Sequence, residues 1–197
     1  LRRHESERIM DEAITIVDDR EFFRGIGFDF EGLTRQRVPL VENGVARRPV
    51  FDRPCALEAG GGFASTGHAD RQPSAGGPSP SHLRMLVDDA KQVPPAALTE
   101  ALGDGLVITQ FHYTNLIDPV QVSITGMTRN GTFLVEDGRV VGPVRNLRFT
   151  VDVLDVLSEI VAASSQSETV LPFFGDAASS VPALVLPAFR FTSTTDF

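Results

Sequence analysis

"GLTRQRVPLVENGVARRPV" occupies residues 32–50, and "GMTRNGTFLVEDGRVVGPV" occupies residues 126–144. The two stretches start 94 positions apart, and nine of their nineteen aligned residues are identical. Unrelated segments of average composition share roughly one residue in nineteen. We therefore expect an internal duplication, in which the chain builds the same structural unit twice.

Each copy carries a turn signal between two apolar segments. Asn43-Gly44 in the first copy and Asp137-Gly138 in the second are dipeptides that type I′ turns prefer, because both central residues need a positive φ. Each copy therefore predicts a β-hairpin, and the turn chemistry explains the repeated glycine.

The similarity extends upstream of the hairpins. Ile14-Thr15 aligns with Ile108-Thr109 at the same offset, and residues 13–19 form a β-branched run that predicts a strand. Both copies then have the order strand, connection, hairpin. The predicted repeats span residues 13–56 and 106–150, and a Gly/Ser/Pro-rich loop over residues 57–82 joins them. A loop of this length is usually functional or disordered.

The other segments are interpreted from periodicity, caps and turn residues. The predicted fold is α+β: one β-rich domain over residues 1–197 with two or three helices. The remaining expected elements are a short helix over 1–12, a short helix over 94–105, strands over 106–113 and 119–125, an amphipathic helix over 150–163 with Thr150 as its N-cap, a loop over 164–180 and a closing strand over 181–194.

Composition limits the function classes. The net charge is −8, which disfavours a nucleic-acid surface, and no apolar run approaches the ~20 residues of a membrane helix. The single Cys55 excludes an internal disulfide and a multi-cysteine zinc site. One Lys among 18 basic residues fits a high-GC bacterial genome. We expect a cytoplasmic protein, and the first residue, Leu1, suggests the C-terminal part of a longer chain.

Three histidines invite a catalytic or metal-binding interpretation. "HESER" begins at His4 but has Arg8 where the zinc motif HExxH needs its second histidine, so a solvated helix start is favoured. His68, in "STGHAD", could bind a metal or act as a base, but no second histidine lies at ligand spacing, which favours a loop residue near a turn. His112 is expected at the surface of an edge strand.

Cys55 and the pair Asp18-Asp19 have plainer interpretations. Cys55 is expected to be a small buried side chain rather than a nucleophile. Adjacent strand residues point to opposite faces, so Asp18 and Asp19 make poor partners for shared acid or metal chemistry. We expect them to end a strand.

Arg35 and Arg129 hold equivalent places in the two repeats, each after a threonine. A guanidinium can anchor a carboxylate of a peptide ligand or of the protein itself. Because Glu42 and Glu136 are also duplicated, a structural salt bridge is favoured over ligand binding. His68, Arg35 and Arg129 nevertheless remain the candidate substrate-binding residues, and no catalytic residue or metal ligand is assigned.

Several spaced segments resemble one family in order along the chain. "ITIVDD", "FDFEGLTRQRVPLVENGV", "ASTGHA", residues 105–150 and the closing "VPALVLPAFRFTS" are similar to the C-terminal domain of the TldD/PmbA family, also known as modulators of DNA gyrase. The resemblance begins near Ala13 and reaches the end of the chain.

The resemblance implies a cytoplasmic zinc metallopeptidase that degrades unfolded peptides or processes peptide precursors. The family forms homodimers, or heterodimers of a TldD-type subunit with a TldE (PmbA) partner. In the catalytic subunit, zinc is held by an upstream HExxxH helix and by a cysteine shortly before the final strand. The matching segment here, "SSQSETVLPFFGDAASS", has no cysteine, and "STGHA" is closer to the zinc-free partner.

Two hypotheses follow from the sequence. The first is the C-terminal part of a TldD/PmbA-type peptidase or of its non-catalytic partner, with zinc in the catalytic subunit and none bound by this chain. The alternative is a non-enzymatic module that binds peptides or assembles subunits through exposed strand edges. Bound zinc and chelator-sensitive peptide cleavage in the full-length protein separate the two.

Overall fold

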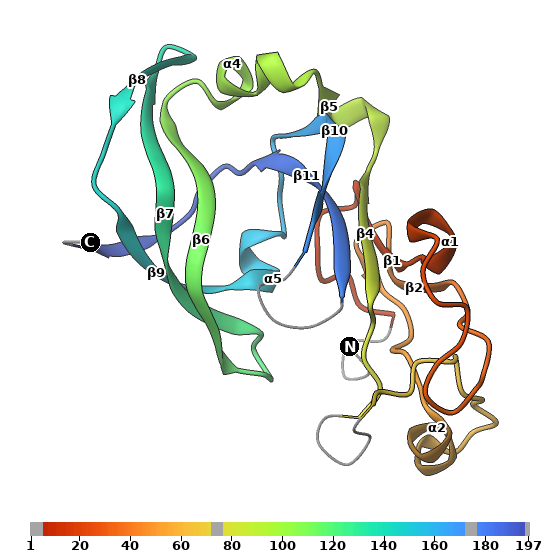
Figure 1. The fold of residues 1–197 in the computed structure, drawn as a ribbon. Coiled ribbons are helices and arrows are strands. Elements are labelled where there is room, and N and C mark those ends of the chain that lie inside the picture. The colour runs from red at the N-terminus through yellow and green to blue at the C-terminus, as the bar shows by residue number, and fades with distance from the viewer. Residues whose placement is uncertain (1–5, 72–76, 172–176, 196–197) are drawn as a thin grey trace. The chain divides into compact units, whose positions relative to one another are not determined.

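The computed structural model describes residues 6–71, 77–171 and 177–195 of the chain (Figure 1). Their contacts divide the chain into two compact units. Unit 1 comprises residues 1–8, 12–87 and 167–182, and unit 2 comprises residues 9–11, 88–166 and 183–197. The first predicted repeat thus falls in unit 1 and the second in unit 2.

Unit 1 is built on a mixed β-sheet in the order β3-β2-β1-β4-β11. Strand β1 pairs antiparallel with both β2 and β4, and β11 runs parallel to β4. The strands are β1 (Ile14–Asp18), β2 (Val38–Glu42), β3 (Val45–Ala46), β4 (His82–Val87) and β11 (Ala178–Val185). The predicted strand over residues 13–19 is therefore confirmed as β1.

Two short helices of unit 1 begin at aspartate caps. Helix α1 (Arg20–Phe23) follows Asp19, whose carboxylate accepts from the N–H of Phe22. Helix α2 (Arg53–Ala59) follows Asp52, whose carboxylate accepts from the N–H of Cys55 at 2.7 Å. Neither helix was expected, since each is too short for a periodic pattern to predict it.

The hydrophobic core cluster of unit 1 is formed mainly by residues of the first repeat. Val38, Leu40 and Val50 are buried together, and Ile16 and Leu83 pack against them. The core side chains thus come from β1, β2, β4 and the segment after β3. Burial of apolar area at ~25 cal/mol per Å² is the main term that stabilises such a cluster.

Unit 2 is built on an antiparallel sheet in the order β12-β9-β7-β6, with β8 also paired to β7. Its strands are β6 (Gly105–Asp118), β7 (Ser123–Glu136), β8 (Arg139–Pro143), β9 (Leu147–Asp152) and β12 (Phe191–Thr194). Phe149 of β9 is fully buried, and its ring centroid lies 4.8 Å from that of Phe111 and 5.4 Å from that of Phe189. These aromatic contacts join β9, β6 and the segment before β12.

The remaining elements of unit 2 are short. A parallel pairing joins Ala163 of β10 (Ala162–Val170) to Gln92 of β5 (Gln92–Val93). Strands β10 and β11 each have residues in both units. These elements are η2 (Asp89–Lys91), β5 (Gln92–Val93), η3 (Pro95–Ala97), α4 (Leu98–Leu102), α5 (Val153–Val156) and β10 (Ala162–Val170). None of the helices in the described ranges is long and apolar enough to cross a membrane.

Lys91, the chain's single lysine, connects two distant segments of unit 2. Its ammonium donates to the carboxylate of Asp11 at 2.8 Å and to the carbonyl of Ile160 at 2.6 Å. The same carboxylate oxygen accepts from the N–H of Ile160 at 2.9 Å. One buried carboxylate therefore ties residues 9–11 to the segment before β10.

Both predicted hairpin turns are present. Asn43 and Gly44 have φ of 50° and 74° between β2 and β3, and Asp137 and Gly138 have φ of 47° and 75° between β7 and β8. The positive φ values confirm the reading of the two dipeptides.

The pairing register differs between the two copies. Val41 of β2 faces Ile16, whereas the equivalent Val135 of β7 faces Gly105 rather than Gln110, the equivalent of Ile16. The order of strand and hairpin recurs in each unit. The duplication itself stays a prediction.

The β-rich α+β class is confirmed, but several predicted segments differ from the structure. Residues 6–12 form no helix, because Ser6 donates to the carbonyl of Ala46 and Arg8 bridges to Val45 along the edge of β3. Residues 1–5, including His4, lie outside the described ranges. Residues 94–105 do contain the expected short helix, as η3 and α4, and Gly103 ends it with φ 69°.

Of the amphipathic helix predicted over 150–163, only Val153–Val156 are helical, as α5. Thr150 belongs to β9, where its hydroxyl bonds to that of Thr125 on β7 at 3.1 Å. Phe149 and Val151 are buried while Thr150 and Asp152 are exposed. This two-residue period is the signal of a strand, so β9 continues to Asp152 and the helix begins only at Val153.

Two further corrections concern the C-terminal region. The predicted loop over 164–180 contains most of β10 and the start of β11. The single closing strand is instead divided into β11 and β12, with Pro187 in the interval between them.

The strand predicted over 119–125 begins only at Ser123, and β6 extends from Gly105 to Asp118.

Candidate functional site

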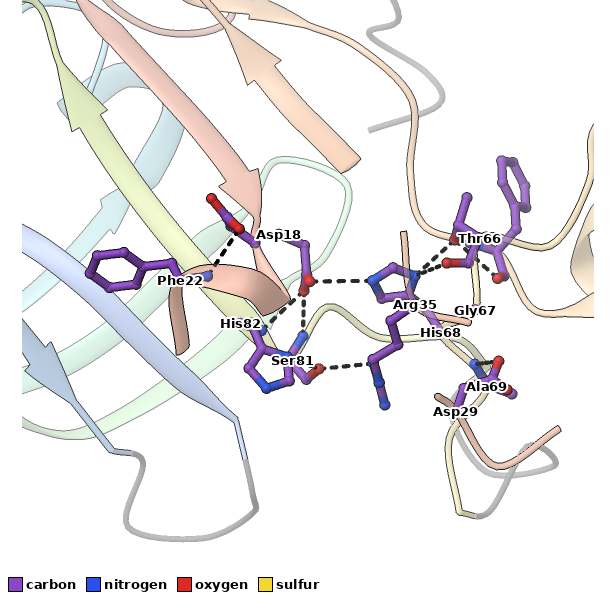
Figure 2. A network of polar contacts seen from close by, with 12 residues as sticks. Asp18, Phe22, Asp29, Arg35, Thr66, Gly67, His68, Ala69, Ser81 and His82 are labelled. Carbon is purple, nitrogen blue, oxygen red and sulfur yellow. Dashed lines mark hydrogen bonds and ion pairs between the residues drawn. The ribbon is translucent and has the colours of Figure 1, made fainter. Parts of the chain in front are cut away.

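Unit 1 contains a buried acid–histidine pair (Figure 2). Asp18 is the last residue of β1, and His68 lies in the long connection between α2 and β4. The ring atom Nε2 of His68 lies 3.3 Å from Oδ1 of Asp18, and both side chains are 0% exposed. The separation fits an ion-pair contact better than a well-aligned hydrogen bond.

The other ring nitrogen of His68 faces Thr66. Nδ1 lies 2.9 Å from both the carbonyl oxygen and the hydroxyl oxygen of Thr66. That hydroxyl also accepts from the N–H of Phe51 at 2.7 Å. The imidazole is therefore held at both nitrogens and cannot turn without breaking buried polar contacts.

The second carboxylate oxygen of Asp18 binds the start of β4. Oδ2 accepts from the backbone N–H groups of Ser81 at 2.7 Å and His82 at 3.0 Å. Burial alone raises the pKa of Asp18, but contact with His68 and the N–H groups of His82 and Ser81 outweighs it and lowers the pKa below 3.8. Asp18 is thus an ionised carboxylate that joins three chain segments.

Gly67 allows the loop to approach the first repeat. It has φ +74°, and a Cβ built there would lie 2.3 Å from the carbonyl oxygen of Thr34. The neighbouring Ala69 donates to Oδ2 of Asp29 at 2.9 Å, and Gln36 donates to the carbonyl of Thr66 at 3.0 Å. "STGHA" is therefore a segment that docks His68 onto residues 29–36.

The order Thr66–His68–Asp18 matches the chemical order of a hydroxyl, an imidazole and a carboxylate in a nucleophilic triad. Catalysis would require the hydroxyl to reach a substrate, but Thr66 is 1% exposed and its oxygen is engaged by the backbone. The three residues instead cross-link β1, the long loop and β4. These contacts hold the loop against the sheet, in line with the interpretation of His68 as a loop residue near a turn.

A half-buried polar chain adjoins this network. Nη1 of Arg35 donates to Oγ of Ser81 at 2.9 Å, and that oxygen lies 2.8 Å from Nδ1 of His82. The pKa of His82 lies below its usual value of 6.5. Burial is the main cause, Arg35 adds to the shift, and Asp18 opposes it. A neutral His82 accepts the hydroxyl proton of Ser81, so all three groups have compatible donors and acceptors.

Asp19 is turned away from Asp18 into a separate ion pair. Its Oδ2 lies 3.1 Å from Nη1 of Arg84 and 3.5 Å from Nε of Arg37. Burial raises the pKa of Asp19, but the N–H of Phe22 and the two arginines lower it on balance. The prediction that the two aspartates act separately and end a strand is confirmed, although Asp18 was missed as the centre of a network.

The two candidate arginines belong to different units. Arg35 lies in unit 1, and Arg129 is exposed on β7 of unit 2. The expected ion pair of Arg35 with the repeated glutamate is absent from the described contacts, since Glu42 pairs with Arg47 at 2.9 Å. Substrate binding by His68, Arg35 and Arg129 stays a prediction, and for His68 it would require the buried ring to become accessible.

Cys55 and His112 lie outside the polar network of unit 1. Cys55 is half-buried in α2, and its pKa is raised, chiefly by a hydrogen bond with Asp52, which disfavours the reactive thiolate. His112 lies on β6, the edge strand of its sheet as expected, although its side chain is half-buried.

The family resemblance implies a zinc ion in the catalytic subunit. Structural and catalytic zinc sites need at least three protein donors of the His, Cys, Asp or Glu type around one point. Across residues 6–71, 77–171 and 177–195 no such group is found. His68 is already enclosed by Asp18 and Thr66, so these residues do not fit a zinc ion.

The family is shown by comparison with known proteins. The family model of the PmbA/TldA metallopeptidase C-terminal domain matches residues 1–194. The chain therefore belongs to this family and represents its C-terminal domain. A comparison with curated protein sequences gives no match.

Solved structures share the fold. TldE from Thermococcus kodakarensis has a TM-score of 0.77 at 22% identity, over 96% of this chain and 41% of that one. A protein named as a DNA gyrase modulator from Thermotoga maritima has a TM-score of 0.77 at 18% identity, over 96% and 41%. Another from Bacteroides thetaiotaomicron has 0.71 at 19% identity, over 96% and 39%. The chain thus spans about two fifths of these proteins.

Proposed function

We propose that this chain is the C-terminal domain of a subunit of a TldD/PmbA-type zinc metallopeptidase, either the catalytic subunit or its non-catalytic partner. The family match over residues 1–194 carries the proposal, and the likeness to TldE supports the fold it requires. The activity is hydrolysis of unfolded peptides or maturation of peptide precursors. The full protein forms a dimer with a TldD-type subunit in the cytoplasm.

The domain contributes structure and peptide contact rather than a reacting group. In the catalytic subunit a bound zinc ion would activate water for attack on the peptide carbonyl. The described residues of this chain do not fit that ion, so no hydrolytic step is assigned to them. The Asp18–His68 network keeps the long loop closed on the sheet of unit 1.

The test uses the full-length protein purified together with its partner subunit. Zinc content is measured by elemental mass spectrometry, and cleavage of an unfolded peptide is followed by chromatography with and without a chelator. The proposal predicts cleavage that the chelator abolishes and added zinc restores. A complex that holds no zinc and cuts no unfolded peptide would refute it.

A peptide-binding module without hydrolysis is the second candidate. Strand β6 has 14 residues, ends the sheet order of unit 2 and has β7 as its partner in the described pairings. An edge strand of this length can add an extended peptide through main-chain hydrogen bonds. Peptide binding by a complex that shows no chelator-sensitive cleavage would favour this candidate.

A further inference from the structure

Strand β6 contains a bulge near its middle. In the pairing with β7, His112 faces Met127 and Asn115 faces Thr125. Two residues of β6, Tyr113 and Thr114, therefore stand opposite one residue of β7. Such a bulge re-aims side chains and is frequent next to binding and active sites.

The partner strand is shaped to accept the bulge. Gly126 is the residue of β7 opposite it, and a Cβ built there would lie 2.7 Å from Cζ of Phe149 and 3.1 Å from Oγ1 of Thr114. Only glycine therefore leaves room for Thr114 above the buried ring. Gly32, the repeat equivalent, has nothing within 4 Å and a φ of +73°, so the two glycines serve different purposes.

Tyr113 adopts a backbone conformation that its side chain disfavours. Its φ is 49°, in the left-handed region where bulky residues are outliers. The side-chain amide of Asn115 donates to the carbonyl oxygen of Tyr113 at 2.8 Å. The strained peptide is thus held by a dedicated local hydrogen bond.

Burial does not compensate this strain. The side chain of Tyr113 is 71% exposed, and its ring contact is the edge of His112, with centroids 4.7 Å apart. A tyrosine kept for the stability of the fold would bury its ring against the core. Exposure together with strain indicates a residue retained for contact with something outside the described chain.

The surroundings of Tyr113 define the chemistry of that contact. Leu116 and Ile117 on the same strand are 59% and 53% exposed. Because adjacent strand residues point to opposite faces, each face of this edge strand carries one of these two exposed apolar side chains. Apolar side chains of an extended chain are the groups that an exposed phenol ring on such a strand can contact.

We propose that Tyr113 is a specificity-determining residue that contacts an aromatic or aliphatic side chain of an unfolded peptide lying along β6. This inference rests on the proposed function, because it names how that peptide is selected. Asn115 and Gly126 are positioning residues that build the bulge. His112 supports the phenol ring through its edge.

The experiment separates strain from binding in the full-length protein with its partner subunit. The variants are Tyr113→Gly and Tyr113→Asn, which tolerate the left-handed region, and Tyr113→Phe, which keeps the ring. Asp137→Gly is the matched control, since Asp137 has φ 47° in the β7–β8 turn. The probes are two fluorescein-labelled unfolded peptides, one with Leu and Phe side chains and one with Ser and Gln in their places.

Fluorescence anisotropy gives the dissociation constants, and thermal unfolding gives the midpoints. The wild type should prefer the apolar peptide. Tyr113→Gly and Tyr113→Asn should weaken its binding about tenfold, which corresponds to loss of one buried aromatic contact. Their unfolding midpoints should equal or exceed that of the wild type. Tyr113→Phe and Asp137→Gly should bind as the wild type does.

Three results would overturn the inference. They are a wild type without preference for the apolar peptide, glycine and asparagine variants that bind it normally, or midpoints that fall in both variants. The proposed function is judged separately by chelator-sensitive cleavage. A complex that selects the apolar peptide through Tyr113 but cuts nothing would retain the inference and remove the peptidase assignment.

Discussion

The Asp18–His68 network of unit 1 and the Tyr113 bulge of unit 2 both contain groups that are unfavourable by themselves. In unit 1 two ionisable side chains are 0% exposed, and surrounding donors and acceptors compensate their burial. In unit 2 a strained tyrosine is 71% exposed, and burial compensates nothing. A histidine in a recognisable sequence motif can therefore be structural, while a strand residue outside any motif is the better candidate for binding.

The largest effect is expected from removing the centre of the unit 1 network. Asp18→Ala leaves the N–H groups of Ser81 and His82 and the ring of His68 without their carboxylate. Breaking a buried pair in this way should lower the free energy of unfolding by about 3–5 kcal/mol. Urea denaturation of the full-length protein measures it.

Glu159→Gln is the control for Asp18→Ala, because Glu159 is exposed and its carboxylate has no hydrogen bond or ion pair with the residues that the structure describes. It should change the free energy of unfolding by less than about 0.5 kcal/mol. An Asp18→Ala protein as stable as this control would show that the network contributes nothing to the fold.

The close approach of the loop to Thr34 at Gly67 should be nearly as sensitive to substitution. Gly67→Ala adds a Cβ at 2.3 Å from the carbonyl oxygen of Thr34 and strains a φ of +74°. The combined cost should be about 2–4 kcal/mol. Gly62→Ala has a similar φ of +79° with nothing within 4 Å, so it should cost only the backbone strain of about 1 kcal/mol. Equal urea midpoints for the two variants would exclude the close packing of the loop.

Lys91→Met tests whether unit 2 depends on a comparable polar centre. The variant removes the ammonium that binds Asp11 and the carbonyl of Ile160, while methionine fills a similar volume. Loss of these charge-assisted bonds should cost about 2 kcal/mol. Hydrogen exchange should rise at the amide of Ile160, which Asp11 also binds. Unchanged exchange there would mean that the Lys91 contacts do not hold this segment.

The smallest predicted effect is a pH dependence of unit 1. The pKa values of Asp18, Asp19 and Asp29 all lie below 3.8, so their ionised forms stabilise the fold above that value. The stabilisation is lost as the pH falls from about 4 through the lowered pKa values. Urea midpoints between pH 6 and pH 3 should therefore fall, and less steeply in Asp18→Asn. Parallel profiles in the two proteins would remove Asp18 from this dependence.

The sequence predicted features whose cause is local. Asn43-Gly44 and Asp137-Gly138 form the expected turns because a positive φ is a property of the residues themselves. The strand over 13–19 and the short helix over 94–105 also follow from nearby residues. Thr150 was misplaced because a two-residue and a helical period overlap at Val151 and Val153.

Features that depend on distant partners were not predictable from one sequence. Asp18 and His68 are 50 residues apart, and no periodicity connects a strand end to a loop. Strand β10 was taken for a loop because its Ser-rich sequence lacks alternation and its pairing supplies the order instead. The bulge at Tyr113 is not predictable, since no residue pattern indicates a bulge. Gly126 lies opposite it, but the repeat gives another explanation for that glycine.

The most direct test of the comparison is the dissociation constant of the apolar unfolded peptide, measured side by side for His68→Gln and Tyr113→Gly in the full-length complex. Both variants are measured at a temperature below their unfolding midpoints. The account predicts wild-type affinity for His68→Gln and about tenfold weaker binding for Tyr113→Gly. Weaker binding by His68→Gln with wild-type binding by Tyr113→Gly would contradict it, and would place the peptide contact in the "STGHA" segment instead.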